Sequence, residues 1–216
     1  MEEKIRKLMK FYLLATKLKY KIRAGWDKDG WNVLAERVES IAEHVYGVCI
    51  LAISIDSEFD MNIDIERVIK MLVLHEIGET IIGDITPFDG VSDDEKNNIE
   101  HKAWKQLLNG LIKEEELYSL LIEFDERKTN DAKFAYLCDK LEADIQSKVY
   151  QDKGYQRSLD DQKTNKCYKY PKIQEILANG AETAFDVWYE NDKSKFEESV
   201  VFKKVLEYVK DNNMNL

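Results

Sequence analysis

The chain has 216 residues and a formal net charge of −10, and this excess of carboxylates argues against a nucleic-acid partner, because phosphate backbones would be repelled. Nine Gly and two Pro are too few for a turn-rich β fold and favour helices. The longest apolar run, Val45 to Ile55, is too short to cross a membrane, and the N-terminal residues do not form a signal peptide. Three cysteines, Cys49, Cys138 and Cys167, have no zinc-ligand spacing and fit a reducing, cytoplasmic location.

The first predicted helix runs from about Glu3 to Tyr20, and its apolar face comprises Ile5, Leu8, Met9, Tyr12 and Leu13. An irregular segment with two tryptophans follows, from Ile22 to Arg37. Ser40-Ile41-Ala42-Glu43 has the pattern of a capping box, in which the Ser and Glu side chains satisfy free backbone donors. It predicts a helix that carries His44 and continues towards Ile55.

The next predicted helix, from Asp64 to about Gly83, contains the most informative stretch of the chain, His75-Glu76-Ile77-Gly78-Glu79. Its polar side chains lie among positions that the helical repeat of apolar residues predicts to be buried. Burying a histidine and a carboxylate costs several kcal/mol unless something pairs with them. A divalent metal is one partner that satisfies both.

The remaining segments also predict helices, each with a start or stop signal. Their expected ranges are Ser92 to Leu108, Glu114 to Glu126, Asn130 or Asp131 to Tyr150, Pro171 to about Tyr189, and a last helix capped by Ser194-Lys195-Phe196-Glu197 that ends near Asp211. No segment alternates convincingly enough to form a strand. We therefore predict one all-α domain over residues 1–216, with a core at about 17–171 and additional C-terminal helices at about 172–216.

Three of these helices carry the candidate metal ligands His44, His75, Glu76 and Asp139. Two imidazoles with carboxylates suit Mn²⁺, Fe²⁺, Co²⁺, Ni²⁺ or Zn²⁺ better than Ca²⁺ or Mg²⁺. Such an ion activates water near neutral pH. Taken alone, His75-Glu76 is equally compatible with an ordinary ion pair on a helix surface, because short motifs often mislead.

Five segments, taken in order, carry a family resemblance: Arg23-Ala24-Gly25-Trp26, Glu39-Ser40-Ile41-Ala42-Glu43-His44, His75-Glu76-Ile77-Gly78-Glu79, Gly83-Asp84-Ile85-Thr86-Pro87 and Asp139-Lys140-Leu141-Glu142. The chain resembles the HD-domain metal-dependent phosphohydrolases, in particular the small all-α HD proteins that include deoxyribonucleoside 5′-monophosphatases. The family pattern is His, His-Asp-x-x-Glu, Gly-Asp with a nearby Pro, and Asp. The chain departs from it once, because Glu76 replaces the Asp of the doublet and is one methylene longer.

The resemblance implies a helical HD-domain bundle and gives each site residue a role. His44, His75, Glu76 and Asp139 would hold the metal. Glu79 and Asp84 would be catalytic, Glu79 acting on the attacking water or the leaving oxygen and Asp84 contacting the sugar or a catalytic water. The implied substrate-binding residues are Arg23, for phosphate, Trp26 and Asp84.

Several residues have a plainer interpretation. Arg23 also fits a solvated basic run, and Trp26 fits simple packing. We expect His101 to be a surface residue, Glu142 to support the metal site or Lys140, and Asp144 to form an ion pair with Lys140.

We therefore expect a cytoplasmic phosphohydrolase that removes phosphate from a small nucleotide, most simply a (deoxy)nucleoside 5′-monophosphate. The alternatives are a hydrolase of another phosphorylated metabolite or of a nucleoside triphosphate, a weakly active regulatory protein that binds metal or nucleotide, and a purely helical scaffold. The family also suggests a homodimer. Apolar residues of the C-terminal helices could form its interface or pack on the core: Ile173, Ile176, Leu177, Phe185, Trp188, Val201 and Leu206.

Overall fold

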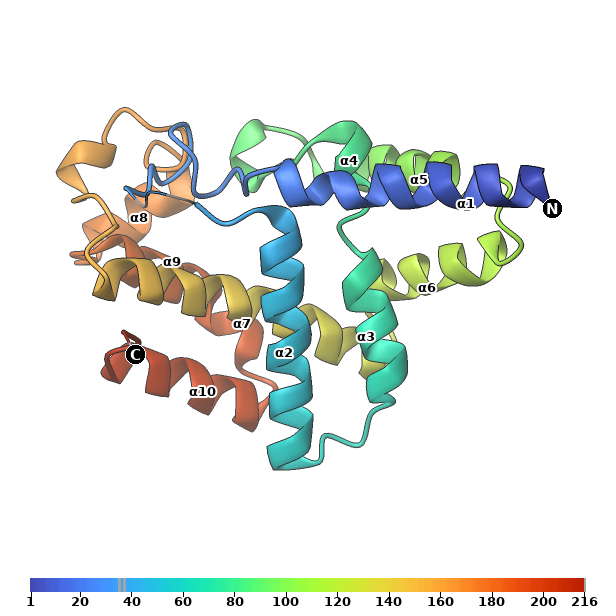
Figure 1. The fold of residues 1–216 in the computed structure, drawn as a ribbon. Coiled ribbons are helices and arrows are strands. Elements are labelled where there is room, and N and C mark those ends of the chain that lie inside the picture. Colours follow the sequence, from blue (N-terminus) through green and yellow to red (C-terminus); the bar gives the residue numbers. More distant parts are fainter. Residues whose placement is uncertain (35, 37, 216) are drawn as a thin grey trace. The chain divides into compact units, whose positions relative to one another are not determined.

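The computed structural model describes residues 1–34, 36 and 38–215, and over these residues the chain is helical without a strand, which confirms the all-α class. The predicted irregular segment includes Ala35 and Arg37, which lie outside the described residues. No described helix combines the length and apolar character that a membrane span requires. The α-helices, shown in Figure 1, are α1 (Glu2–Ala15), α2 (Ile41–Phe59), α3 (Ile65–Leu74), α4 (Glu79–Ile82), α5 (Asp93–Leu108), α6 (Glu114–Glu126), α7 (Asn130–Asp152), α8 (Pro171–Ala178), α9 (Ala184–Asp192) and α10 (Val200–Asp211).

The chain forms two compact units. Unit 1 comprises Met1–Ile22 and Ser40–Tyr136, and unit 2 comprises Arg23–Glu39 and Leu137–Leu216. The long helix α7 begins in unit 1 and continues without interruption into unit 2. This division does not follow the predicted boundary near residue 172, and a single functional domain over the whole chain stays a prediction.

Unit 1 is organised around a core contributed by α5, α6 and the segment after α3. Its buried members are Ile77, Trp104, Leu107, Leu108 and Leu121, and Phe11, Leu14 and Ala15 of α1 pack against them. The helices α2 and α3 lie side by side and run in opposite directions (Figure 1). This packing places the start of α2 and the end of α3 at the same end of the helix pair.

The predicted helix starts of unit 1 are confirmed. Ser40 accepts a hydrogen bond from the backbone N–H of Glu43, and the Glu43 carboxylate accepts one from the backbone N–H of Ser40, which completes a capping box. Asp64 caps α3 and Ser92 caps α5, and each side chain accepts one hydrogen bond from the backbone N–H three residues on. The capping side chains therefore set where each of these helices begins.

The first helix is shorter than predicted and faces the other way. α1 ends at Ala15, and residues Thr16–Tyr20 form a 3₁₀-helix, η1. The expected core face is exposed, because the opposite side of the helix, with Phe11 and Leu14, packs on the core of unit 1. The exposed residues are Ile5, Leu8, Met9, Tyr12 and Leu13.

The C-terminal helices also differ from the prediction. The expected helix from Pro171 to Tyr189 is two helices, because Gly180 has a φ of 101° and Thr183 begins α9 with its own capping box. The predicted cap Ser194 lies inside a short 3₁₀-helix, and Ser199 is the N-cap of α10 instead. The apolar residues Ile173, Ile176, Phe185 and Leu206 are buried, so they pack within the chain as the alternative prediction held.

Candidate metal centre and catalytic segment

His44 is placed by the capping box at the start of α2. Because Ser40 and Glu43 fix the first turn, His44 shares one helix face with Val48, Ala52 and Ile55, and all four are buried. The His44 side chain has no solvent exposure. A fully buried imidazole requires a partner, and a metal is one candidate.

His75 and Glu76 lie where α3 ends. The predicted continuous helix is wrong here, because α3 stops at Leu74 and residues 75–78 form tight turns before α4. The backbone N–H groups of Ile77, Glu79 and Thr80 bond to carbonyls three residues back, at 3.0–3.2 Å. The tighter winding brings residues three apart in the sequence onto the same line along the helix surface, so Glu76 and Glu79 lie one above the other.

The orientation of the His75 ring is fixed by the backbone. Its Nδ1 lies 2.6 Å from the carbonyl oxygen of Leu72, and because a carbonyl can only accept, Nδ1 carries the proton of this hydrogen bond. That tautomer leaves the Nε2 lone pair for a metal, and such a backbone partner is typical of metal-binding histidines. The ring also packs on Phe124, with 5.0 Å between centroids.

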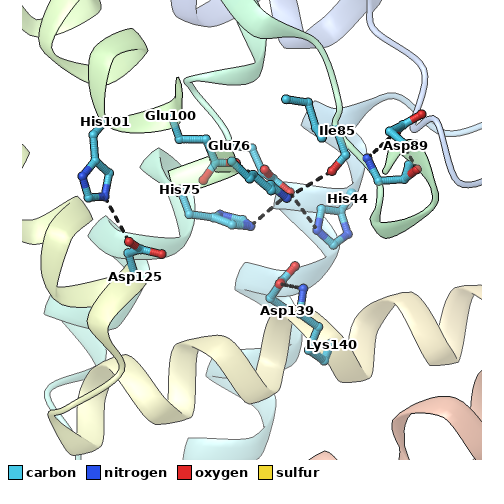
Figure 2. A network of polar contacts seen from close by, with 12 residues as sticks. His44, His75, Glu76, Ile85, Asp89, Glu100, His101, Asp125, Asp139 and Lys140 are labelled. Carbon is cyan, nitrogen blue, oxygen red and sulfur yellow. Dashed lines mark hydrogen bonds and ion pairs between the residues drawn. The ribbon is translucent and has the colours of Figure 1, made fainter. Parts of the chain in front are cut away.

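The three candidate ligands of unit 1 converge, as Figure 2 shows. A Glu76 oxygen, Oε1, lies 3.9 Å from His44 Nε2 and 3.5 Å from His75 Nε2. Bonds of about 2.0–2.2 Å to one ion place neighbouring ligand atoms about 3–4 Å apart, so this donor set fits a divalent transition metal. Glu76 therefore reaches the position expected of a ligand in spite of its extra methylene.

The fourth candidate ligand, Asp139, belongs to unit 2. It lies on α7, three residues after the last residue of unit 1, and is 5% exposed. The Lys140 ammonium is 2.8 Å from Asp139 Oδ2 (Figure 2). Glu142 is buried near it on the same helix. The metal-ligand role of Asp139 and the supporting role of Glu142 stay predictions.

The segment after His75 carries both candidate catalytic carboxylates. Glu79 begins α4 and is 3% exposed. Gly83, with a φ of 84°, ends α4, and the half-buried Asp84 follows. Thr86 and Asp89 then form a capping box that holds the following turn. The structure thus places Glu79 and Asp84 at the two ends of one short, well-braced segment.

Two features near this segment were not predicted from the sequence. Burial raises the pKa of Glu100, with Glu76 and Asp125 adding to the rise and Lys96 opposing it. His101, expected at the surface, is partly buried, lies 3.0 Å from Asp125 Oδ2 and packs on Trp104. The spacing of four between Lys96 and Glu100 was the available signal for their ion pair, which opposes this rise.

The remaining candidates lie in unit 2. Trp26 is 2% exposed, packs on Tyr150 and Trp188 at 5.5 and 4.9 Å, and donates its indole N–H to Glu39 at 2.7 Å. These contacts support the packing alternative for Trp26. Arg23 is partly buried and its backbone N–H bonds to the Glu39 carbonyl. The roles of Arg23 and Trp26 in substrate binding stay predictions.

Asp144 does not form the predicted ion pair with Lys140. It is fully buried, neither carboxyl oxygen has a hydrogen-bond partner among the described residues, and the ammonium of Lys140 contacts Asp139 instead. Burial, followed by the charge of Asp192, raises the pKa of Asp144 well above its usual range. Asp144 is therefore part of the core of unit 2.

Known proteins resemble this chain over most of its length. It is 30% identical over 179 residues to the 5′-deoxynucleotidase HDDC2 of Homo sapiens, covering 80% of this chain and 84% of the relative. It is 31% identical to the Dictyostelium discoideum protein of the same name, covering 68% of this chain and 80% of the relative. The Schizosaccharomyces pombe 5′-deoxynucleotidase hdd1 is 35% identical over 64% of this chain and 69% of its own length.

Solved structures share the fold. A crystal structure from Pyrococcus horikoshii OT3 has a TM-score of 0.67 at 23% identity, covering 93% of this chain and 97% of the other. A predicted metal-dependent phosphohydrolase from Magnetospirillum magnetotacticum MS-1 has a TM-score of 0.66 at 23% identity, covering 96% and 94%. The HD domain family model matches residues 15–184, which span α2 to α8 and all of the site residues above. The chain therefore belongs to the HD domain family.

Proposed function

We propose that this protein is a metal-dependent phosphohydrolase that removes phosphate from a nucleoside 5′-monophosphate, with deoxynucleotides as the first candidates. The observation that carries the proposal is the convergence of His44, His75 and Glu76 within unit 1, followed directly by Glu79 and Asp84. The 5′-deoxynucleotidase names of relatives at about 30% identity support the substrate class.

The proposed metal is one divalent ion of Mn, Fe, Co, Ni or Zn, held by His44, His75 and Glu76 and completed by Asp139. When bound, such an ion polarises a phosphate oxygen and activates water near neutral pH. The buried imidazoles exclude bulk water from the donor atoms and keep both rings in place. The His75–Leu72 hydrogen bond selects the tautomer that can ligate.

The other residues have proposed roles in binding and proton transfer. Glu79, buried and one short turn from Glu76, accepts a proton from the attacking water or returns one to the leaving oxygen. Asp84 contacts the sugar or orients water. Arg23 contributes a planar guanidinium that suits a phosphate.

Phosphate release from a panel of nucleoside mono-, di- and triphosphates tests the proposal, with metal stripped and then Mn²⁺, Co²⁺ or Zn²⁺ restored. We expect metal-dependent release of orthophosphate from monophosphates. Release of intact tripolyphosphate would instead identify a triphosphohydrolase, and turnover of only other phosphate esters would identify another metabolite as the substrate. Metal binding without any turnover would favour a regulatory protein.

Glu79→Gln separates chemistry from metal binding, because the amide keeps the size of the side chain and removes its basicity. We expect phosphate release to fall by at least about 100-fold, in the range typical for a general acid or base. Metal affinity measured by calorimetry should stay unchanged. Glu115→Gln, at an exposed position on α6, is the matched control and should leave both quantities unchanged.

Replacing Glu76 tests the alternative that this protein is a weakly active regulatory protein. If the longer side chain reduces catalysis, Glu76→Asp should raise kcat, whereas a lower metal affinity in this variant would show that the site has adapted to Glu. The distances from Glu76 to both imidazoles support the second expectation. We therefore expect Glu76→Asp to bind metal more weakly than the parent chain.

We also propose a homodimer that forms through α1. Its exposed apolar side chains need a cover, the helix begins with the acidic Glu2 and Glu3, and the 3₁₀-helix that follows it carries the basic Lys17 and Lys19. Two antiparallel copies therefore match in both charge and apolar surface. Light scattering should show a dimer that Leu8→Glu weakens. The free cysteines lead us to propose a cytoplasmic location.

A further inference from the structure

Two lysine ammonium groups bond to backbone carbonyls at the two ends of the segment that carries Glu79 and Asp84. Lys21 Nζ donates to the carbonyl oxygen of Glu79 at 2.6 Å. Lys96 Nζ donates to the carbonyl oxygen of Ile85 at 3.1 Å. Both bonds lie within unit 1 and are partly buried.

Lys21 comes from a part of the chain distant in sequence from its acceptor. It follows the 3₁₀-helix η1, and its backbone carbonyl accepts the N–H of Ile41 at 2.8 Å, which ties it to the start of α2. The adjacent bridge between Ile22 and Ser40 holds the same strand-like segment. Lys21 thus links the start of α2, which carries His44, to the start of α4.

Lys96 comes from the first turns of α5. Its Nζ also lies 3.6 Å from Glu100 Oε1, so the carboxylate holds the ammonium in place at the Ile85 carbonyl. Glu100 is itself partly buried beside Glu76 and Asp125 (Figure 2). Lys96 therefore links the loop after Gly83 to the rigid helix α5.

We propose that Lys21 and Lys96 form a two-lysine clamp that positions the segment from Glu79 to Ile85. The proposal rests on the function proposed above, because it assigns the clamp to the carboxylates of that site. The backbone N–H groups of residues 79–83 bond only to carbonyls of the same short stretch, and a helix this short depends on tertiary contacts for its position. Charge-assisted bonds at both ends supply that restraint. Lys21 and Lys96 are positioning residues, since they bond to the backbone.

Lys21→Met and Lys96→Met, singly and together, remove the ammonium while keeping an unbranched side chain. Lys70→Met, on α3, and Lys102→Met, on α5, are matched controls with the same change of charge at exposed positions. Each variant is measured by hydrogen–deuterium exchange of the 79–86 backbone amides, by steady-state kinetics on the best nucleotide, and by metal affinity.

We expect exchange at residues 79–86 to quicken by about tenfold in each clamp variant, as for loss of one charge-assisted bond, with the rest of unit 1 unchanged. We expect kcat to fall by about tenfold with KM within about twofold of the parent, since the carboxylates are displaced and not removed. Lys21→Arg and Lys96→Arg should restore both quantities, and the Met controls should resemble the parent.

Unchanged exchange in both clamp variants would overturn the proposal. So would a raised KM with unchanged kcat and exchange, because the lysines would then bind substrate. The exchange measurement needs no turnover. It therefore tests the clamp even if the parent protein releases no phosphate from any nucleotide, a result that would count against the proposed function alone.

Discussion

Gly78→Ala should destabilise the protein, although alanine usually favours a helical backbone. A Cβ at this position would lie 2.9 Å from Trp104 Nε1 and 3.1 Å from its Cδ1, whereas carbon atoms in contact are normally about 3.5–4.0 Å apart. Trp104 cannot easily move away, because it is 2% exposed and packs in the core with Ile77, Leu107 and Leu121.

The size of the effect follows from two opposing terms. Alanine reduces the conformational freedom of the unfolded chain, which stabilises the folded variant by about 0.4–1 kcal/mol. Overpacking of the core at Trp104 costs about 1–3 kcal/mol. We therefore expect a net loss of about 1–2 kcal/mol in the free energy of unfolding. Because Gly78 lies between Glu76 and Glu79, we also expect weaker metal binding.

Urea denaturation followed by circular dichroism measures the stability, and calorimetry measures metal affinity. Gly25→Ala is the control, because a Cβ there would meet nothing within 4 Å, and it should be neutral or slightly stabilising. A Gly78→Ala protein as stable as the parent, with equal metal affinity, would refute the argument that Trp104 excludes a side chain at this position.

Three further predictions concern a cap, a buried acid and the metal. Ser40→Ala should cost about 1 kcal/mol in urea denaturation, and a cost no larger than that of Ser54→Ala would contradict the capping argument. Because the raised pKa of Asp144 makes the folded state hold its proton above pH 3.8, this carboxyl lowers the free energy of unfolding as the pH rises beyond that value. Asp144→Asn should make the free energy of unfolding, measured by urea denaturation, depend less on pH. An unchanged pH dependence would show that Asp144 is not its source. Mn²⁺ added to stripped protein should raise Tm in the parent and in His101→Ala but much less in His75→Ala, and equal shifts would remove His75 from the site.

The helix starts were predictable because capping is local. The Ser40 and Ser92 side chains act on backbone groups three residues away, so the sequence alone contains both partners. The same rule was available at Thr183 and Asp186, where overlooking it merged α8 with α9. Local signals thus account for both the confirmed starts and this error.

Features that depend on tertiary packing were not predictable in the same way. The apolar pattern of α1 is nearly continuous around the helix, so periodicity did not reveal that Phe11 and Leu14, and not Leu8, face the core. The break after Leu74 occurs in a sequence with good helical periodicity, and the close packing of Gly78 on Trp104 involves residues 26 positions apart. Tertiary contacts therefore decided both.

The candidate site shows the same division. The convergence of His44, His75 and Glu76 followed from the ordered motifs. The lysine contacts to the Glu79 and Ile85 carbonyls could not be predicted, because every residue type offers the same backbone carbonyl as an acceptor. Motifs record side-chain chemistry and omit the bonds that hold the main chain in place.

The tight turns from His75 to Glu79 restrict which sequence changes this segment can accept. A change of side-chain length, such as Glu for Asp at position 76, alters only how far one carboxylate reaches. Inserting or deleting one residue would rotate everything beyond it by about 120°, moving Glu79 off the shared line and Gly78 away from Trp104. Substitutions can therefore diversify the chemistry of this site over evolution, whereas the number of residues between the doublet and the second carboxylate cannot change.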